Sequence, residues 1–246
     1  MIDINKPTHN PYLPQAGKGY KFVFIDLDDT LWDFHSNANI CLRMIFEKHR
    51  LNEYFVDFDA FFSIYARRNL ELWDMYGKGE IDKDFLMMER FRYPLALMGV
   101  DDVHVAKLIG DEYLALLPTQ HGLMPNAREM LDYLSSKYPL TLISNGFVDT
   151  QYQKMRSSNI EHYFKHIVLS EQAEALKPDK KIFEYALQLN NAQPHETIMI
   201  GDSYLADICG ARNAGIDQAY YPNAARSDEH FATYIIDDLL ALKGIL

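Results

Sequence analysis

The stretch KFVFIDLDDT, from Lys21 to Thr30, decides the fold of this protein. Its first part is a short, continuous apolar run rich in Val, Ile and Phe, which is typical of a strand buried in a parallel sheet. Three carboxylates, those of Asp26, Asp28 and Asp29, follow where this strand ends. Carboxylates this close repel one another unless a cation or a proton lies among them. The stretch therefore predicts a buried parallel strand with a site at its carboxyl end.

Beyond Pro125 the sequence alternates between short apolar runs and helical patterns. Such alternation predicts a parallel sheet covered by helices on both faces, so the expected fold class is α/β, a Rossmann-like doubly wound sheet. The further strands are expected at 140–144, 166–170, 197–201 and 216–220. The helices between them are expected at 127–135, 150–157, 179–189 and 204–214.

Residues 36–118 have a different character, because apolar side chains recur there at helical spacing and no strand pattern is present. This block interrupts the α/β domain after its first strand, so we expect an inserted all-helical domain. The expected boundaries are an N-terminal extension at 1–19, an α/β core made of 20–34 and 119–246, and the helical insertion at 35–118.

The composition limits the partners of this protein. It has 24 Lys and Arg against 35 Asp and Glu, a net charge of −11. A chain this acidic is a poor candidate for binding a nucleic-acid polymer, which needs clustered cations. There is no run of about 18 apolar residues to span a membrane, and no secretory signal at the N-terminus. We therefore expect a cytoplasmic protein that binds neither a nucleic-acid polymer nor a membrane.

Polar residues follow two of the expected strands, at the sheet edge where open α/β folds bind ligands. Asp26 and Asp28 are two apart on an extended segment, so their side chains lie on one face. Their carboxylates suit a hard cation such as Mg²⁺. Ser144, Asn145 and Gly146 offer a hydroxyl and backbone amides, which suit phosphate oxygens.

A lysine and two more acids come later in the chain. Lys177 precedes a proline, which favours an extended backbone at the lysine. Asp202 follows a buried strand, and Asp207 lies five residues further on, where a helix has begun. Each segment alone has an ordinary structural explanation, as a capping loop, a turn, a surface lysine or a helix N-cap. Together, and in this order, they favour a site for a metal ion and a phosphate group.

These segments resemble the four motifs of the haloacid dehalogenase-like superfamily. The resemblance spans residues 20–246 and implies that the inserted helices form that superfamily's cap domain. It also implies a Mg²⁺-dependent phosphohydrolase. The matching segments are DLDDT at 26–30, SNG at 144–146, the lysine of LKPD at 176–179 and GDSYLAD at 201–207.

The resemblance implies a role for each acid of the first motif. Asp26 would attack phosphorus to give an aspartyl-phosphate intermediate, and Asp28 would act as the general acid and base. Mg²⁺ would be held by Asp26, the backbone carbonyl of Asp28 and Asp202. Superfamily members that cleave carbon–halogen bonds lack the second aspartate, so Asp28 favours phosphate chemistry. A phosphomutase would keep it too, and ranks below a hydrolase.

The remaining motifs would surround the phosphoryl group. Ser144, the Asn145 amide and Lys177 would stabilise negative charge on its oxygens. Thr30 would hold the nucleophile loop, and Asp207 would orient Lys177 or a metal-bound water.

Longer segments resemble the non-standard pyrimidine nucleotidase family, which hydrolyses nucleoside 5′-monophosphates. They are DLDDTLWDFHSNA, LWDMYGKGEI, SNGF and LSEQAEALKPDKKIFEYAL. A nucleobase needs a flat apolar partner, and Trp73 and Phe147 are the candidates for contacting it. A phosphatase for sugar phosphates or other small phosphometabolites is the main alternative. A non-catalytic binding protein would require a missing nucleophile or metal ligand, and none is missing.

Overall fold

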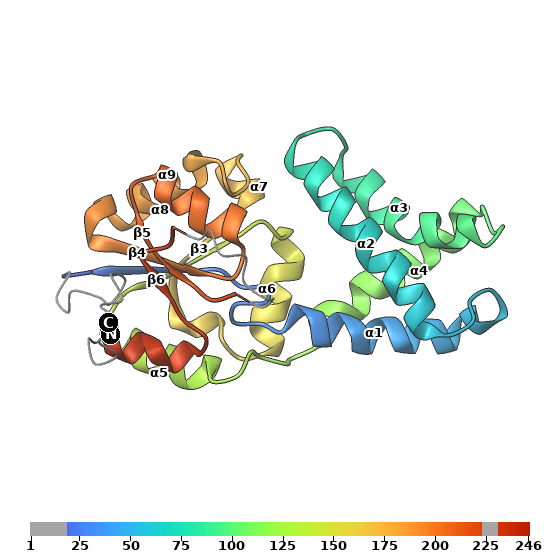
Figure 1. Cartoon of the computed structure of the whole chain (residues 1–246), viewed down its shortest axis with the longest axis horizontal. Helices are drawn as coiled ribbons and strands as arrows, with labels where there is room; N and C mark the ends of the chain where they lie inside the picture. The colour runs from blue at the N-terminus through green and yellow to red at the C-terminus, as the bar shows by residue number, and fades with distance from the viewer. Residues whose placement is uncertain (1–18, 223–230) are drawn as a thin grey trace, which may run out of the picture. The chain divides into compact units, whose positions relative to one another are not determined.

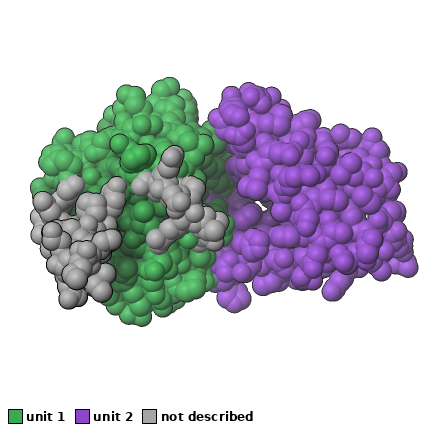
Figure 2. Space-filling view, in the orientation of Figure 1, with its two compact units in different colours: residues 1–31, 123–147, 160–246 green, residues 32–122, 148–159 purple. Residues whose placement is uncertain are grey.

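The computed structural model describes residues 19–222 and 231–246, so the extension expected at 1–19 lies outside it except for Gly19. The chain divides into two compact units (Figure 2). We call the first the α/β unit; it consists of residues 1–31, 123–147 and 160–246. The second, the helical unit, consists of residues 32–122 and 148–159.

The α/β unit is built on a six-stranded sheet of order β3-β2-β1-β4-β5-β6, in which neighbouring strands run parallel. The strands are β1 Phe22–Ile25, β2 Leu140–Ser144, β3 Phe164–Leu169, β4 Thr197–Gly201, β5 Asp217–Tyr220 and β6 Tyr234–Ile235 (Figure 1). This is the strand order of a doubly wound fold, so the expected fold class is confirmed. The order reverses at β1, which has β2 on one side and β4 on the other, and such a switch point is where these folds bind ligands.

The central strands are apolar because both of their faces are covered. Phe24 and Ile25 of β1 are at most 1% exposed, and every residue of β2 and β4 is buried. Ile25 is level with Leu142 of β2 and Ile200 of β4. Because the next residue is Asp26, its side chain emerges from the sheet close to the ends of both neighbouring strands.

Helices cover both faces of this sheet (Figure 1). Phe24 and Met199 of the sheet belong to one apolar cluster with Phe183 of α8 and Ala211 of α9, and α5 lies on the other face. The helices are α5 Ala127–Ser135, α7 Ser170–Ala173, α8 Lys180–Asn190 and α9 Gly210–Asn213.

Two elements of the α/β unit differ from the expectation. The single helix expected at 204–214 is a π-helical turn, Tyr204–Cys209, followed by α9. Strand β6 was not expected, because a strand of two residues is too short to show an alternating pattern. Its identity as a strand comes only from pairing with β5, a contact that is distant in sequence.

The helical unit contains α1 Phe34–Lys48, α2 Phe58–Gly77, α3 Lys83–Leu97, α4 Val103–Leu116 and α6 Val148–Ser157. An aspartate begins each of α1 to α4, and its carboxylate accepts a hydrogen bond from a backbone N–H of the first turn, as is usual at helix N-caps. These residues are Asp33, Asp57, Asp82 and Asp102. Within the described residues, the helices are all too short or too polar to cross a membrane.

Helix α6 groups with the helical unit, whereas the boundaries expected from the sequence place it in the α/β core. Its Lys154 is buried, and the ammonium lies 4.6 Å from the ring centre of Trp32. A cation over an indole face is an attractive contact, and it is not visible in the local pattern of either segment. The assignment of the helical unit as a cap domain stays a prediction.

Candidate active site

Lys177 lies between two buried carboxylates at the end of β1. Its ammonium donates to Asp26 Oδ1 at 2.5 Å, to Asp207 Oδ1 at 2.6 Å and to the carbonyl of Ile143 at 2.9 Å. The lysine is 5% exposed and Asp26 is 6% exposed. Because an ammonium has three N–H donors, these contacts use all of them and hold the cation in one position.

Asp202 follows β4, and Thr30 ties it to the loop that follows β1. The Thr30 hydroxyl donates to Asp202 Oδ1 at 3.1 Å and accepts from the Asp202 backbone N–H at 3.0 Å. One carboxylate oxygen from each of Asp26, Asp202 and Asp207 lies within 4.8 Å of the others. With Lys177, the three carboxylates keep two negative charges. An all-oxygen set of this charge fits a divalent hard cation such as Mg²⁺.

Burial and repulsion make these carboxylates hold protons more tightly. Burial raises the pKa of Asp26 well above its usual range, Asp207 and Asp202 add to the rise, and Lys177 opposes it. Burial raises the pKa of Asp202 to about 7, with Asp207 and Asp29 adding to the effect. For Lys177, burial alone would lower the pKa, but Asp207 and Asp26 outweigh it and the pKa is raised. The lysine is therefore a cation, and protons compete with any metal for the acids.

The Ser-Asn-Gly segment ends β2 beside this cluster. Ser144 is buried, and its Oγ accepts from the backbone N–H of Gly146 at 3.2 Å. The Asn145 side chain donates to the Lys177 carbonyl at 2.9 Å and accepts from the Lys177 N–H at 2.7 Å. These two bonds hold the backbone of the lysine against the end of β2. Because the side-chain amide of Asn145 bonds to the lysine backbone, its main-chain N–H is the group left for the phosphate contact that the sequence predicts.

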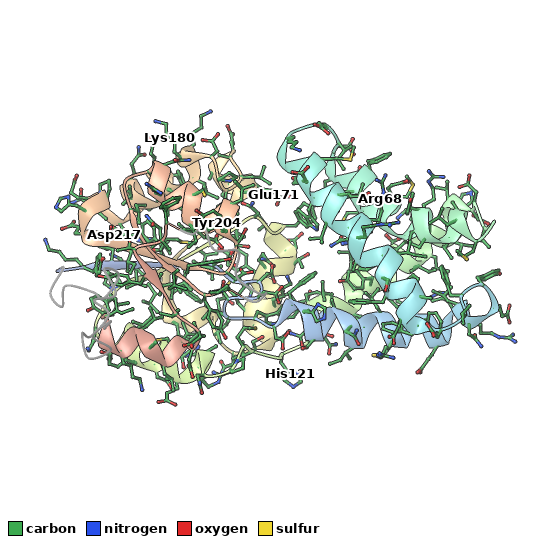
Figure 3. All side chains as sticks on the ribbon, viewed as in Figure 1. Arg68, His121, Glu171, Lys180, Tyr204 and Asp217 are labelled. Carbon is green, nitrogen blue, oxygen red and sulfur yellow. The ribbon has the colours of Figure 1, made fainter. Side chains whose placement is uncertain are left out.

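Asp207 reaches the site from the π-helical turn that begins at Tyr204, labelled in Figure 3. It is fully buried; Oδ2 accepts from the N–H of Ser203 at 3.0 Å, and Oδ1 accepts from Lys177. A Cβ on Gly201 would lie 2.5 Å from the Cβ of Asp207, so no side chain fits at position 201. π-Helical turns occur often at functional sites, and here the turn places a carboxylate against the end of β4.

Other candidates lie as follows. Asp28 is half-buried in the loop after β1. Asp29, to which the sequence assigned no role, has a left-handed backbone with φ of 58°. Aspartate tolerates this conformation better than most residues.

Phe147 is buried in the α/β unit, while Trp73 is half-buried on α2 of the helical unit, its ring 5.8 Å from that of Tyr76. Substrate contact by either ring stays a prediction.

The sequence profile of the haloacid dehalogenase-like hydrolases matches residues 20–215. The chain belongs to this family. This hydrolase is 30% identical to the pyrimidine 5′-nucleotidase PynA of Streptococcus pneumoniae, over 90% of this chain and 94% of the relative. It is 28% identical to the glyceraldehyde 3-phosphate phosphatase of Pyrococcus furiosus, over 92% of both chains.

Among solved structures, the hydrolase is similar to the putative HAD-hydrolase YfnB of Bacillus subtilis, crystallised with bound magnesium. The TM-score is 0.81 at 29% identity, and the match covers 92% of this chain and 98% of the other. The family resemblance drawn from the sequence motifs is thus confirmed, and the chain is an enzyme of the hydrolase class.

Proposed function

We propose that this hydrolase is a Mg²⁺-dependent phosphomonoesterase that acts on pyrimidine nucleoside 5′-monophosphates through an aspartyl-phosphate intermediate. The observation that carries the proposal is the buried Lys177 between Asp26 and Asp207, with Asp202 within reach of the same point. A cation beside clustered acids at the switch point of a doubly wound sheet is suited to an anionic substrate. The similarity to a pyrimidine 5′-nucleotidase supports the choice of substrate.

In the first half of the reaction, Asp26 is the nucleophile. Lys177 engages its Oδ1, which leaves Oδ2 to attack phosphorus. The bond between phosphorus and the ester oxygen breaks, and the departing alkoxide takes a proton from Asp28. The Ser144 hydroxyl and the Asn145 main-chain N–H donate to the phosphoryl oxygens, where negative charge must be stabilised.

In the second half, water attacks the phosphorus of the aspartyl-phosphate. Asp28, now ionised, accepts the proton of that water, and the Asp26 carboxylate leaves with its electron pair. Asp207 and Asn145 act through the lysine, because one holds its ammonium and the other its backbone. Asp26, Asp202 and the backbone carbonyl of Asp28 would hold Mg²⁺, which when bound offsets the negative charge of the acids and the phosphoryl group.

The test is phosphate release from a panel of nucleotides and sugar phosphates, with Mg²⁺ and with EDTA. The wild type should prefer pyrimidine nucleoside 5′-monophosphates and be inactive in EDTA. Asp26→Asn should lose turnover by about 10⁴-fold or more, as expected for loss of a nucleophile. Asp237→Asn, an exposed acid of the same unit, is the matched control and should keep full activity. Turnover in EDTA, or by Asp26→Asn, would refute the mechanism.

A phosphatase for small sugar phosphates is the second candidate. The observation that favours it is the similarity to a glyceraldehyde 3-phosphate phosphatase across 92% of both chains. The same panel separates the two candidate functions, because they share one mechanism and differ only in which substrate has the higher kcat/KM. A higher kcat/KM for triose or hexose phosphates than for pyrimidine nucleotides would replace the nucleotidase proposal and keep the chemistry.

A further inference from the structure

Helix α3 of the helical unit carries a buried arginine, Arg90, for which the described residues provide no acidic partner. It is 4% exposed, and its Nε and Nη2 are enclosed without a hydrogen bond. These two nitrogens form one edge of the guanidinium, the edge that binds anions through two parallel N–H bonds. Buried donors are nearly always paired, so this bare edge marks a place where an acceptor belongs.

Aromatic rings surround the guanidinium and exclude most water. Its carbon lies 4.9 Å from the ring centre of Tyr113 and 5.3 Å from that of Phe91. The Tyr65 ring packs against both, with centroids 6.1 Å and 5.3 Å away. All three rings are at most 3% exposed. Their faces attract a cation, but they do not supply acceptors for N–H bonds along the guanidinium edge.

The adjacent carboxylate is already used by other arginines. Glu89, 4% exposed, accepts from Arg92 at 2.7 Å and 3.3 Å and lies 3.6 Å from Arg68, labelled on α2 in Figure 3. Two arginines, Arg92 and Arg68, therefore share this buried carboxylate, and their further acidic partners are the exposed Asp101 and Glu71. None of these carboxylates pairs with Arg90, whose charge is left without an acidic partner among the described residues.

Two more donors lie beside Arg90. The hydroxyls of Tyr65 and Tyr113 are both enclosed, and they interact with each other. Burial raises the pKa of both phenols, and the charge of Arg90 acts on both in the opposite direction. They therefore stay protonated and able to donate. The alternative occupant is a buried water that links Arg90 to Oδ1 of Asn69. That oxygen is also enclosed without a hydrogen-bond partner, and Asn69 lies one helical turn from Tyr65.

We propose that the helical unit binds a small monovalent anion, of the halide, nitrate or formate kind, on the Nε–Nη2 edge of Arg90, with a hydroxyl of the Tyr65–Tyr113 pair as a further donor. The anion neutralises a charge that the protein itself leaves unpaired. A water satisfies the hydrogen bonds but not the charge, which is why the anion is favoured. This site is independent of the proposed phosphatase function.

The direct test is a crystal of the full chain grown or soaked in sodium bromide. An anomalous peak within hydrogen-bonding distance of Arg90 Nε and Nη2 is the expected result. A second crystal in sodium nitrate or formate should show planar density on the same edge. Density for a water alone in both crystals would overturn the proposal, as would a direct hydrogen bond from Arg90 to Asn69.

Solution measurements use the same anions at constant ionic strength, balanced with gluconate, a larger anion. The unfolding midpoint of the wild type should rise saturably, by about 2–4 °C once the anion is several-fold above its dissociation constant. Arg90→Met should lose this increment. Arg43→Met, the same change at a half-exposed arginine of α1, is the matched control and should keep it. Equal increments in wild type and Arg90→Met would overturn the proposal, and if Arg90→Met does not fold, the bromide crystal decides.

Discussion

The side chain of Asp207 occupies the space in which residue 201 would carry its Cβ. A Cβ there would lie 2.5 Å from the Cβ of Asp207, so the end of β4 must be glycine for this carboxylate to reach Lys177. The packing of one residue thus decides the position of an ion pair. Because the same lysine contacts Asp26, a change at position 201 reaches Asp26 through two hydrogen bonds.

Gly201→Ala should therefore damage catalysis although residue 201 has no side chain to take part in it. We expect kcat to fall by about 10²-fold, the effect of displacing a positioned group by about an ångström. Overpacking should also cost about 1–3 kcal/mol of stability. Steady-state kinetics and chemical unfolding measure the two effects. Gly244→Ala, where nothing lies within 4 Å of an added Cβ, is the control; wild-type kcat in Gly201→Ala would contradict the packing argument.

Lys177→Met should destabilise the metal-free protein, because it leaves buried carboxylates without their cation. Loss of one partner from a buried pair costs about 3–5 kcal/mol. The loss should be smaller at pH 5 than at pH 8, since Asp26 and Asp202 can take protons in place of the lysine charge. Unfolding in urea at both pH values measures it. Lys180→Met is the control, because that lysine is exposed (Figure 3) and its ion pair is with the half-buried Glu184. Equal losses at the two pH values would contradict the charge argument.

Stabilisation by Mg²⁺ should grow with pH. The pKa of Asp202 is raised to about 7 from an ordinary value of 3.8. The metal-free protein therefore holds a proton that the unfolded chain releases. The resulting stability is fully present below about pH 4 and is lost as pH rises through 7. Mg²⁺ needs the ionised acid, so the rise in unfolding midpoint on adding Mg²⁺ should be small at pH 5 and large at pH 8.

Thermal unfolding with Mg²⁺ and with EDTA at each pH gives that difference directly. Comparing the two at the same pH removes the effect of every group that the metal does not touch. Asp202→Asn should abolish most of the increment at pH 8. An increment that is constant from pH 5 to pH 8 would show that protons do not compete at this site.

The two candidate base contacts can be separated from the chemistry by choice of substrate. Trp73→Leu and Phe147→Leu should each raise KM for a pyrimidine nucleotide by about 5- to 150-fold, the loss of one stacking contact. KM for ribose 5-phosphate, which has no base, should change little. Tyr54→Leu, an exposed aromatic of the helical unit, is the control. An equal rise for both substrates would assign these rings to packing rather than to the base.

Much of the α/β unit could be predicted because its signals are local. Buried parallel strands are continuous apolar runs, and β2 and β4 have the bounds that the sequence predicts, 140–144 and 197–201. Helix α5 also begins and ends where expected, at 127 and 135. The acids that follow β1 and β4 come together because adjacent parallel strands end at one edge.

Other features could not be predicted because they depend on contacts between distant segments. Asn145 holds the backbone of a residue 32 positions away, and a strand-to-loop turn looks the same with or without that contact. The helical pattern of 204–214 is broken into a π-helical turn where Asp207 meets Gly201 and Lys177. The unpaired Nε–Nη2 edge of Arg90 could not be predicted either. Glu89 is adjacent to Arg90 in sequence, yet its carboxylate pairs with Arg92.

By itself, the sequence determined which residues could do chemistry and the family to which the chain belongs, since short motifs and apolar runs need only neighbouring residues to be recognised. Only the tertiary structure decided how those residues are charged and held. A pKa or an ion pair depends on burial and on distances of a few ångströms between side chains far apart in the chain, and folding alone sets these.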